Sequence, residues 1–198
     1  MPLPKRQTYT TDYIYSLPDG QRAELIDGVV YDMAPPSFQH QKLVAQFTKI
    51  IGKYIDEKGG SCEVLPAPFA VFLNADDKTY VEPDISVICN QGKLNDKGCN
   101  GAPDWIIEIV SSSSKRMDYF IKLFKYRSAG VREYWIVDPL KNRITVYNFE
   151  TEDNEDYTFT DCIKVGIYED LEIDFSTKFS EESPSSKQGV GRGEIAIL

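Results

Sequence analysis

Apolar and polar residues alternate along this 198-residue chain in patterns that predict a short helix over residues 10–16, two longer helices and a series of short strands. Between residues 37 and 58 the apolar side chains recur at three-, four- and seven-residue spacing, which predicts a long amphipathic helix capped by Ser37. A second helix is predicted over residues 115–129 and is followed by a glycine stop. Ahead of both, Asp27-Gly28 between short β-rich runs predicts a tight hairpin, because glycine accepts the positive φ of such a turn.

Two β-rich runs, 81–88 and 103–111, each contain one acid among apolar neighbours. Asp84 opens the first run and Glu108 interrupts the second, and the polar segment 90–102 between them predicts a mobile loop. A strand that is buried on both faces is apolar throughout, and a lone carboxylate inside one costs several kcal/mol. Each acid therefore needs a partner, such as Arg, Lys or a metal ion, and we take the two acids as one shared cation site.

The remaining chain adds short strands and a polar end. Apolar, β-branched and aromatic runs predict further short segments at 62–65, 69–73, 132–137 and 171–175. Residues 143–149 and 157–165 predict an edge hairpin with an acidic connection. We expect residues 1–180 to form one domain and residues 181–198, which contain few apolar side chains, to be a disordered tail.

Composition narrows the class of protein. The hydrophobic share of 41% and the charged share of 27% are ordinary for a soluble protein, and no apolar stretch approaches the roughly 20 residues of a membrane helix. We therefore expect a cytoplasmic protein without a membrane partner. The four cysteines are scattered without a C-x-x-C pair, which favours reduced thiols over a disulfide or a zinc site. The single histidine, His40, disfavours histidine-rich zinc sites and His-based triads.

Charge is distributed unevenly. The net charge of −9 is not typical of a nucleic-acid-binding protein. Basic residues nevertheless concentrate between residues 115 and 143. They are Lys115, Arg116, Lys122, Lys125, Arg127, Arg132, Lys141 and Arg143. This stretch could face a polyanion or could be a solvated helix face, and charge alone supports both interpretations equally.

The candidate chemistry follows from which ligand types are present. Two carboxylates with almost no His or Cys make an oxygen-ligand site, which suits Mg²⁺ or Mn²⁺ better than Zn²⁺. On the second predicted helix, Asp118, Lys122 and Tyr126 share one face. Either that face looks back at the acid pair and Lys122 adds charge there, or Asp118 and Lys122 form a surface ion pair. The first interpretation predicts metal-dependent phosphodiester hydrolysis.

Several segments match the motifs of one known family in the correct order. They are Glu24-Leu25-Ile26-Asp27-Gly28, His40, Pro83-Asp84-Ile85, the segment 105–111, Asp118-Tyr119-Phe120-Ile121-Lys122-Leu123 and the segment 130–139. Over roughly residues 8–180 the chain resembles the Uma2-type proteins, also called DUF820. The resemblance implies a restriction-endonuclease-like, PD-(D/E)XK fold, which is an α/β (α+β mixed sheet) fold with a central mixed sheet flanked by helices. It also implies an endonuclease role.

The resemblance assigns roles by position. It makes Asp84 and Glu108 metal ligands, adds the backbone carbonyl of Ile109 as a further ligand, and places Glu24 as an additional acid near the metal. Val110 occupies the position of the motif lysine. In this family, a lysine on the helix that follows this strand resembles a substitute for the motif lysine. The match here is Lys122, whose ammonium must reach the acid pair; if it cannot, Lys115 is the next candidate.

The remaining assignments concern support and binding. His40, Ser111, Asp118 and Tyr126 match family positions as supporting residues. Taken without the resemblance, Glu24 is typical of a surface strand residue and His40 of a structural helix residue. The predicted nucleic-acid-binding residues are Lys115, Arg116, Lys125 and Arg127.

The leading hypothesis is a Mg²⁺-dependent (or Mn²⁺-dependent) DNA endonuclease. Its rival is a catalytically inactive nuclease-fold module that binds nucleic acid or protein, which the missing lysine at position 110 and the acidic composition favour. A third idea, a small-molecule hydrolase that uses Ser111 and His40, is weak because no nucleophile-elbow pattern surrounds Ser111. A homodimer is plausible, because paired active sites cut duplexes.

Overall fold

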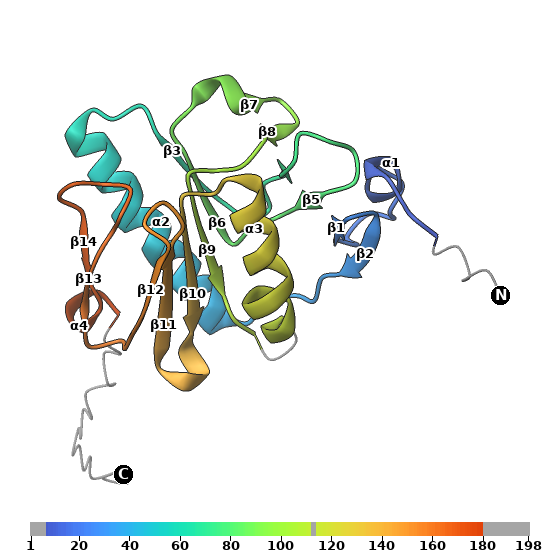
Figure 1. The fold of residues 1–198 in the computed structure, drawn as a ribbon. Helices are drawn as coiled ribbons and strands as arrows, with labels where there is room; N and C mark the ends of the chain where they lie inside the picture. The colour runs from blue at the N-terminus through green and yellow to red at the C-terminus, as the bar shows by residue number, and fades with distance from the viewer. Residues whose placement is uncertain (1–6, 112–113, 180–198) are drawn as a thin grey trace, which may run out of the picture.

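The computed structural model of the chain describes residues 7–111 and 114–179 (Figure 1). The tail predicted over residues 181–198 lies outside the described residues. In the part that is described, no helix is both long and apolar enough to cross a membrane.

A mixed six-stranded sheet forms the centre of the structure, in the strand order β12-β11-β10-β9-β6-β3. Its strands are β3 (Glu63–Pro66), β6 (Ile85–Ile88), β9 (Trp105–Ile109), β10 (Glu133–Asp138), β11 (Arg143–Asn148) and β12 (Asp153–Tyr157). Within this sheet, only β9 and β10 pair in parallel. Parallel neighbours need a long crossover, and the helical residues 115–129 supply it.

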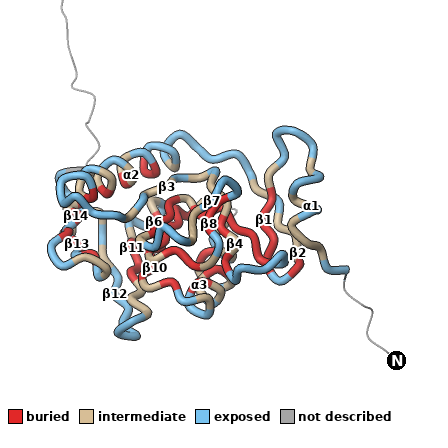
Figure 2. Tube along the Cα trace, turned by 90° about the horizontal axis from the view of Figure 1, so that it is seen from above, coloured by how far each residue is buried: buried red, intermediate tan, exposed pale blue. Residues whose placement is uncertain are grey.

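Helices cover both faces of this sheet, as Figures 1 and 2 show. One face carries α2 (Phe38–Lys58), and beside it lie β13 (Cys162–Lys164), β14 (Glu172–Asp174) and α4 (Phe175–Lys178). The other face carries the crossover, which consists of a π-helical stretch η2 (Met117–Lys122) and α3 (Leu123–Ala129). Both of the longer predicted helices are confirmed, and Ser37 caps α2 by accepting a hydrogen bond from the His40 N–H at 3.2 Å.

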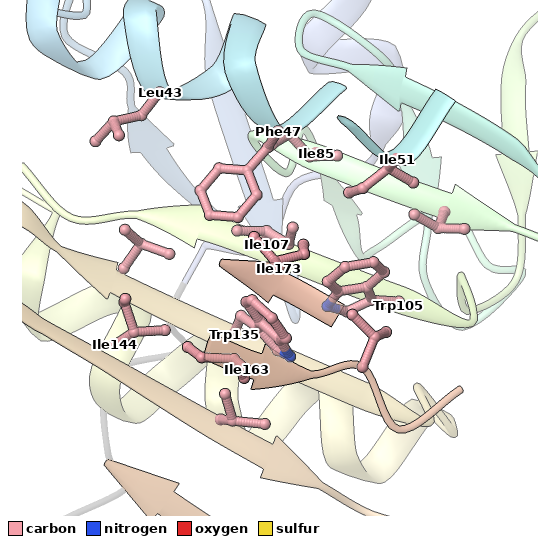
Figure 3. Packing of buried hydrophobic residues seen from close by; sticks show 14 of the residues in the cluster. Leu43, Phe47, Ile51, Ile85, Trp105, Ile107, Trp135, Ile144, Ile163 and Ile173 are labelled. Atoms are coloured by element: carbon pink, nitrogen blue, oxygen red, sulfur yellow. The ribbon is translucent and has the colours of Figure 1, made fainter. Parts of the chain in front are cut away.

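The alternation of side chains along β9 separates two cores. Trp105, Ile107 and Ile109 pack under α2, where Figure 3 shows residues of α2 against β9 and β10. Ile106 and Val110 belong instead to the cluster on the α3 face. Successive strand residues point to opposite faces, so Glu108 must also face α3.

A second, smaller sheet has the order β2-β1-β5-β4-β8-β7. Its strands are β1 (Ala23–Ile26), β2 (Val29–Asp32), β4 (Val71–Phe72), β5 (Tyr80–Val81), β7 (Leu94–Asn95) and β8 (Gly98–Asn100). The short helix α1 (Thr11–Tyr15) precedes it. The predicted hairpin at residues 27–28 is confirmed: β1 and β2 are antiparallel, and Asp27 and Gly28 have φ of 50° and 74°.

Two predictions about the central runs are wrong. The run 81–88 is not one strand, because β5 ends in the small sheet and β6 begins in the large one. Pro83 lies at the break, and proline has no N–H to donate to a strand ladder. The predicted mobile loop 90–102 instead forms a short 3-10 helix, η1 (Gln91–Lys93), and the antiparallel pair β7–β8. Gly98 makes this possible, since a Cβ there would lie 2.2 Å from the carbonyl oxygen of Ala70.

The predicted edge hairpin is also paired differently. β11 pairs with β12, so the acidic segment that was expected to be a connection is itself the edge strand. Residues 162–164 pair with β14 rather than with β11. An edge strand is solvent-exposed and tolerates charge, which is why an acidic composition did not exclude a strand here.

The cysteine prediction is wrong for two of the four residues. Cys62 and Cys89 form a disulfide, with 3.9 Å between their Cα atoms, while Cys99 and Cys162 are free. The pair Glu63↔Ile88 is the last rung of the β3–β6 ladder, so the cysteines occupy the next facing position. This proximity depends on strand register across 27 residues of sequence, which spacing motifs do not record.

Candidate active site

Asp84 and Glu108 meet because β6 and β9 run antiparallel. Ile85 pairs with Ile107, so the residue before β6 faces the residue after Ile107. The Asp84 N–H donates to Glu108 Oε2 at 3.3 Å, and the Ile109 N–H donates to Asp84 Oδ2 at 2.7 Å. The two acids and the Ile109 backbone therefore form one contiguous group at the end of the sheet where β9 finishes.

Lys122 reaches this acid pair. Its Nζ lies 2.9 Å from Glu108 Oε1, 2.9 Å from Glu24 Oε1 and 3.9 Å from Asp118 Oδ1. Tyr126, one turn further along the helix, donates its hydroxyl to Glu108 Oε1 at 2.7 Å. The geometric condition placed on Lys122 is met, and the exposed Lys115 is not needed in its place.

The cluster is almost completely shielded from solvent. Lys122 is 5% exposed and Glu108 is 3% exposed, and Glu24 and Asp118 are equally buried. Glu24 is therefore no surface strand residue, and the Asp118–Lys122 contact is no surface ion pair. The Glu82 N–H donates to Glu24 Oε1 at 3.0 Å, which fixes that acid from the residue that follows strand β5.

Burial sets the electrostatics of these groups. It raises the pKa of Glu108 well above its usual value, with Lys122 opposing the rise and the neighbouring carboxylates adding to it. It likewise raises the pKa of Asp118 to about 6, again against the influence of Lys122. Burial alone would lower the pKa of Lys122, but the charges of Glu108 and Glu24 outweigh it and raise that pKa well above its usual value. One ammonium thus serves several buried carboxylates, and the pocket favours additional positive charge.

His40 supports the acid pair from α2. Its Nε2 lies 3.1 Å from Asp84 Oδ2. Burial lowers the pKa of His40, but the hydrogen bond and the charge of Asp84 exceed that effect, and the pKa is raised overall. The Ser111 hydroxyl donates to Ser114 Oγ at 3.1 Å. His40 therefore engages a carboxylate, and the geometry gives no support to a Ser111–His40 nucleophilic pair.

A cleft of about 1260 Å³ opens over these residues. Glu24, Asp84, Glu108 and Lys122 all line it. Its walls come from the segment 33–36 and the start of α2 on one side, and from the turn after β10 on another. In Figure 1 the start of α2, the end of β9 and the turn after β10 lie together at the lower end of the central sheet.

The donor atoms suit a hard divalent cation. Asp84, Glu108 and the Ile109 carbonyl offer only oxygen, as Mg²⁺ and Mn²⁺ prefer. Asp84 Oδ2 accepts from His40 and Ile109, while its Oδ1 accepts no hydrogen bond from the residues that the structure describes. Over the same residues, no three His, Cys, Asp or Glu side chains are grouped as a ready metal site. Glu108 is instead turned onto Lys122 and Tyr126.

The four residues predicted to bind nucleic acid separate into two pairs. Lys125 Nζ lies 2.7 Å from Asp27 Oδ1, and Arg127 Nη2 lies 3.0 Å from Glu152 Oε1. Lys115 and Arg116 are exposed and form no ion pair with a described residue. They follow Ser114, which lines the cleft, so only this pair borders the candidate site.

Sequence reasoning missed two residues of the site. The buried Tyr134 hydroxyl donates to the Asp118 carbonyl oxygen at 3.0 Å and so fixes the helical turn that carries Lys122. Strand alternation in β10 could have placed Tyr134 on the α3 face. Lys42, exposed on α2, lines the opposite wall of the cleft, and no local signal in the sequence marks it.

Comparisons with known proteins agree with this architecture. A crystal structure described as a putative nuclease belonging to DUF820, from Anabaena variabilis ATCC 29413, matches with a TM-score of 0.69 at 19% sequence identity. The match covers 86% of this chain and 97% of that chain, and it confirms the predicted mixed α/β fold. An uncharacterized protein, slr1290, from Synechocystis sp. (strain ATCC 27184 / PCC 6803 / Kazusa) is 22% identical over 129 residues.

That second match spans 65% of this chain and 66% of the relative, just under two thirds of its length. The model of the Uma2 family, described as "Putative restriction endonuclease", matches residues 10–170, which is most of the chain. The chain therefore belongs to the Uma2 family.

Proposed function

We propose that this protein is a Mg²⁺-dependent (or Mn²⁺-dependent) DNA endonuclease that hydrolyses phosphodiester bonds. The observation that carries the proposal is the convergence of Asp84 and Glu108 in the cleft, with Lys122 Nζ 2.9 Å from Glu108. Family membership supports a nuclease activity.

Asp84, Glu108 and the Ile109 carbonyl would hold the cation. When bound, Mg²⁺ supplies a Lewis acid for the phosphate and lowers the pKa of a water nucleophile. The chain's own residues arrange this group. Tyr126 holds one oxygen of Glu108 at 2.7 Å, and His40 holds Asp84 at 3.1 Å. Both ligands are thereby kept in one orientation before a substrate arrives.

Lys122 takes the place of the lysine that Val110 does not supply. Its ammonium is buried beside Glu108, where a positive charge is weakly screened and acts strongly on a phosphate oxygen. Glu24 shares this ammonium and so fixes its position.

The rival function is a nuclease-fold module without catalysis. One observation favours it: both oxygens of Glu108 already accept hydrogen bonds, from Lys122 and Tyr126 on one side and from the Asp84 N–H on the other. In that case the buried ion cluster would be structural, and the protein would bind nucleic acid or protein without cutting.

A cleavage assay separates the two. Supercoiled plasmid, linear duplex and single-stranded DNA are incubated with wild type, Asp84→Ala and Asp170→Asn in Mg²⁺, Mn²⁺ or EDTA. Asp170 is a matched control, because it is also a hydrogen-bonded carboxylate but lies outside the cleft. We expect cutting by wild type and Asp170→Asn that requires metal, and none by folded Asp84→Ala.

Cutting that survives in Asp84→Ala or in EDTA would overturn the proposal. If wild type does not cut, calorimetry with Mg²⁺ decides between a narrow substrate and a retired site. Metal binding that depends on Asp84 supports the enzyme, whereas its absence supports the binding module. A homodimer and a cytoplasmic location remain predictions, and size-exclusion chromatography with light scattering tests the first.

A further inference from the structure

Two cations, Lys141 and Arg143, lie against the ring of Tyr119. Arg143 Nη2 donates to the Tyr119 hydroxyl at 3.1 Å, and its Cζ lies 5.4 Å from the ring centroid. Lys141 Nζ lies 5.5 Å from the same centroid. Lys115, whose charge lowers the pKa of Lys141, is exposed and forms no ion pair with a described residue. We call Lys115, Lys141 and Arg143 the rim cluster.

The carboxylates nearby do not fully neutralise the rim cluster. Asp138 is buried and already accepts the Lys141 N–H at 3.2 Å and the Tyr119 hydroxyl at 3.4 Å, while its Oδ2 stays 3.9 Å from Lys141 Nζ. Asp156 lies 3.8 Å from Arg143 Nη1 and is more than half exposed. Like charges held close together repel, so this arrangement is most stable with an anion between them.

The chain around the rim cluster forms part of the cleft wall. Leu140 and Asn142, on either side of Lys141, both line the cleft, and so does Ser114 next to Lys115. Lys141 ends the short 3-10 helix η3 (Pro139–Lys141), whose Leu140 is 78% exposed. An exposed apolar side chain beside cations is a common feature of surfaces that contact nucleic-acid bases and backbone together.

Two other basic residues of the helical segment 115–129, which begins with Lys115, differ from the rim cluster in their partners. Lys125 and Arg127 each have a carboxylate partner within hydrogen-bond distance, Asp27 and Glu152. Their charges are used within the chain, whereas those of the rim cluster are in excess. The basic residues predicted on this helix therefore fall into two groups, according to whether a carboxylate neutralises them.

We propose that Lys115, Lys141 and Arg143 form a binding site for backbone phosphates of a nucleic-acid strand that continues into the cleft toward Asp84 and Glu108. This inference rests on the proposed nuclease function for the identity of the ligand. The rim cluster positions the strand and takes no part in the chemistry.

The test measures DNA binding without cleavage. Fluorescence anisotropy of a labelled duplex and of a labelled single strand is recorded in EDTA, over a series of salt concentrations, for wild type and three variants. They are the double variants Lys115→Gln/Lys141→Gln and Lys125→Gln/Arg127→Gln, and the charge-preserving Lys115→Arg/Lys141→Arg. The first two remove the same charge from the same region of the chain, so they form a matched pair.

We expect Lys115→Gln/Lys141→Gln to weaken binding on the order of ten-fold at low salt and to reduce the slope of log K against log salt by about 2. Lys115→Arg/Lys141→Arg should retain both values, and the slope for Lys125→Gln/Arg127→Gln should not change. Equal slopes for the two Gln double variants would overturn the rim cluster as a phosphate site.

This result is separable from the proposed function. Wild type that binds DNA with the expected salt slopes, but neither cuts it nor binds Mg²⁺ through Asp84, would leave the rim cluster standing and overturn the nuclease. If wild type cuts DNA while Lys115→Gln/Lys141→Gln binds DNA normally, the nuclease proposal stands and the rim cluster is overturned as a phosphate site. Wild type that binds neither DNA form would overturn both.

Discussion

Both faces of the central sheet bury apolar side chains, and the α3 face also buries a cluster of charged ones. Toward α2, strands β9 and β10 present Trp105, Ile107 and Trp135 to an apolar cluster, beside which the buried Glu133 accepts a hydrogen bond from Trp135 Nε1 at 2.6 Å. Toward α3, β9 presents Glu108, which meets Lys122 across the interface. The same five-residue strand therefore stabilises the fold with one set of alternate residues and carries a charged site with the other.

A contribution to stability does not explain why the α3 face buries this cluster of charged side chains. Replacing a buried ion cluster by apolar residues of equal volume is often neutral or stabilising, because desolvation offsets the Coulomb attraction. An apolar residue in place of Glu108 would have extended the α3-side core without that penalty. The cluster lines a cleft instead, which is the arrangement expected when charge serves binding or catalysis.

The largest expected effect on the free energy of unfolding comes from removing a buried aromatic side chain on the α2 face. Phe47 is fully buried, with its ring centroid 6.3 Å from Trp135 and 5.6 Å from Phe175. Phe47→Ala should lower the free energy of unfolding by about 3–5 kcal/mol through lost contacts and a cavity. Urea unfolding followed by tryptophan fluorescence measures the change. A loss under about 1 kcal/mol would mean that this face collapses around the cavity rather than packing rigidly.

The next effect comes from removing the ammonium that the buried carboxylates of the α3 face share. Lys122→Met leaves Glu24, Glu108 and Asp118 without their shared cation, and we expect a loss of about 3 kcal/mol in the free energy of unfolding. Adding Glu108→Gln to it should recover part of that loss, because one buried charge is then gone. As a control, Lys125→Met breaks a partly exposed pair and should cost about 0–1 kcal/mol.

A loss in the double variant that equals the sum of the losses in Lys122→Met and Glu108→Gln would contradict this account. The two side chains would then contribute independently, although they lie 2.9 Å apart.

The smallest effect tests whether a buried hydroxyl on the α3 face positions a proposed metal ligand or only stabilises the fold. Tyr126→Phe removes the hydroxyl that holds Glu108, and Tyr134→Phe removes one that holds the Asp118 backbone. Each should lower the free energy of unfolding by about 1–2 kcal/mol. Only Tyr126→Phe should also change the rise in melting temperature that Mg²⁺ produces, as followed by thermal denaturation with and without the metal. If both variants respond to Mg²⁺ like wild type, Tyr126 is structural alone.

Much of the site was predictable because its residues break a local pattern. Asp84 and Glu108 are acids within apolar runs, and Lys122 shares a helix face with Asp118 and Tyr126. The long helix and the hairpin were equally clear from spacing and turn chemistry. These features are local, since the burial of a side chain follows from the period of its own strand or helix.

Only the tertiary structure decided which distant residues meet. Glu24 comes from the smaller sheet and reaches Lys122 through folding, and Cys62 meets Cys89 through strand register. Lys125 is neutralised by Asp27 in a hairpin almost 100 residues earlier in the chain, while Lys115 forms no ion pair with a described residue. The sequence by itself therefore determined the helices, most of the strands and the acids that mark the site. Folding decided the partners of each charge, because a charge interacts through space and periodicity describes only neighbours along the chain.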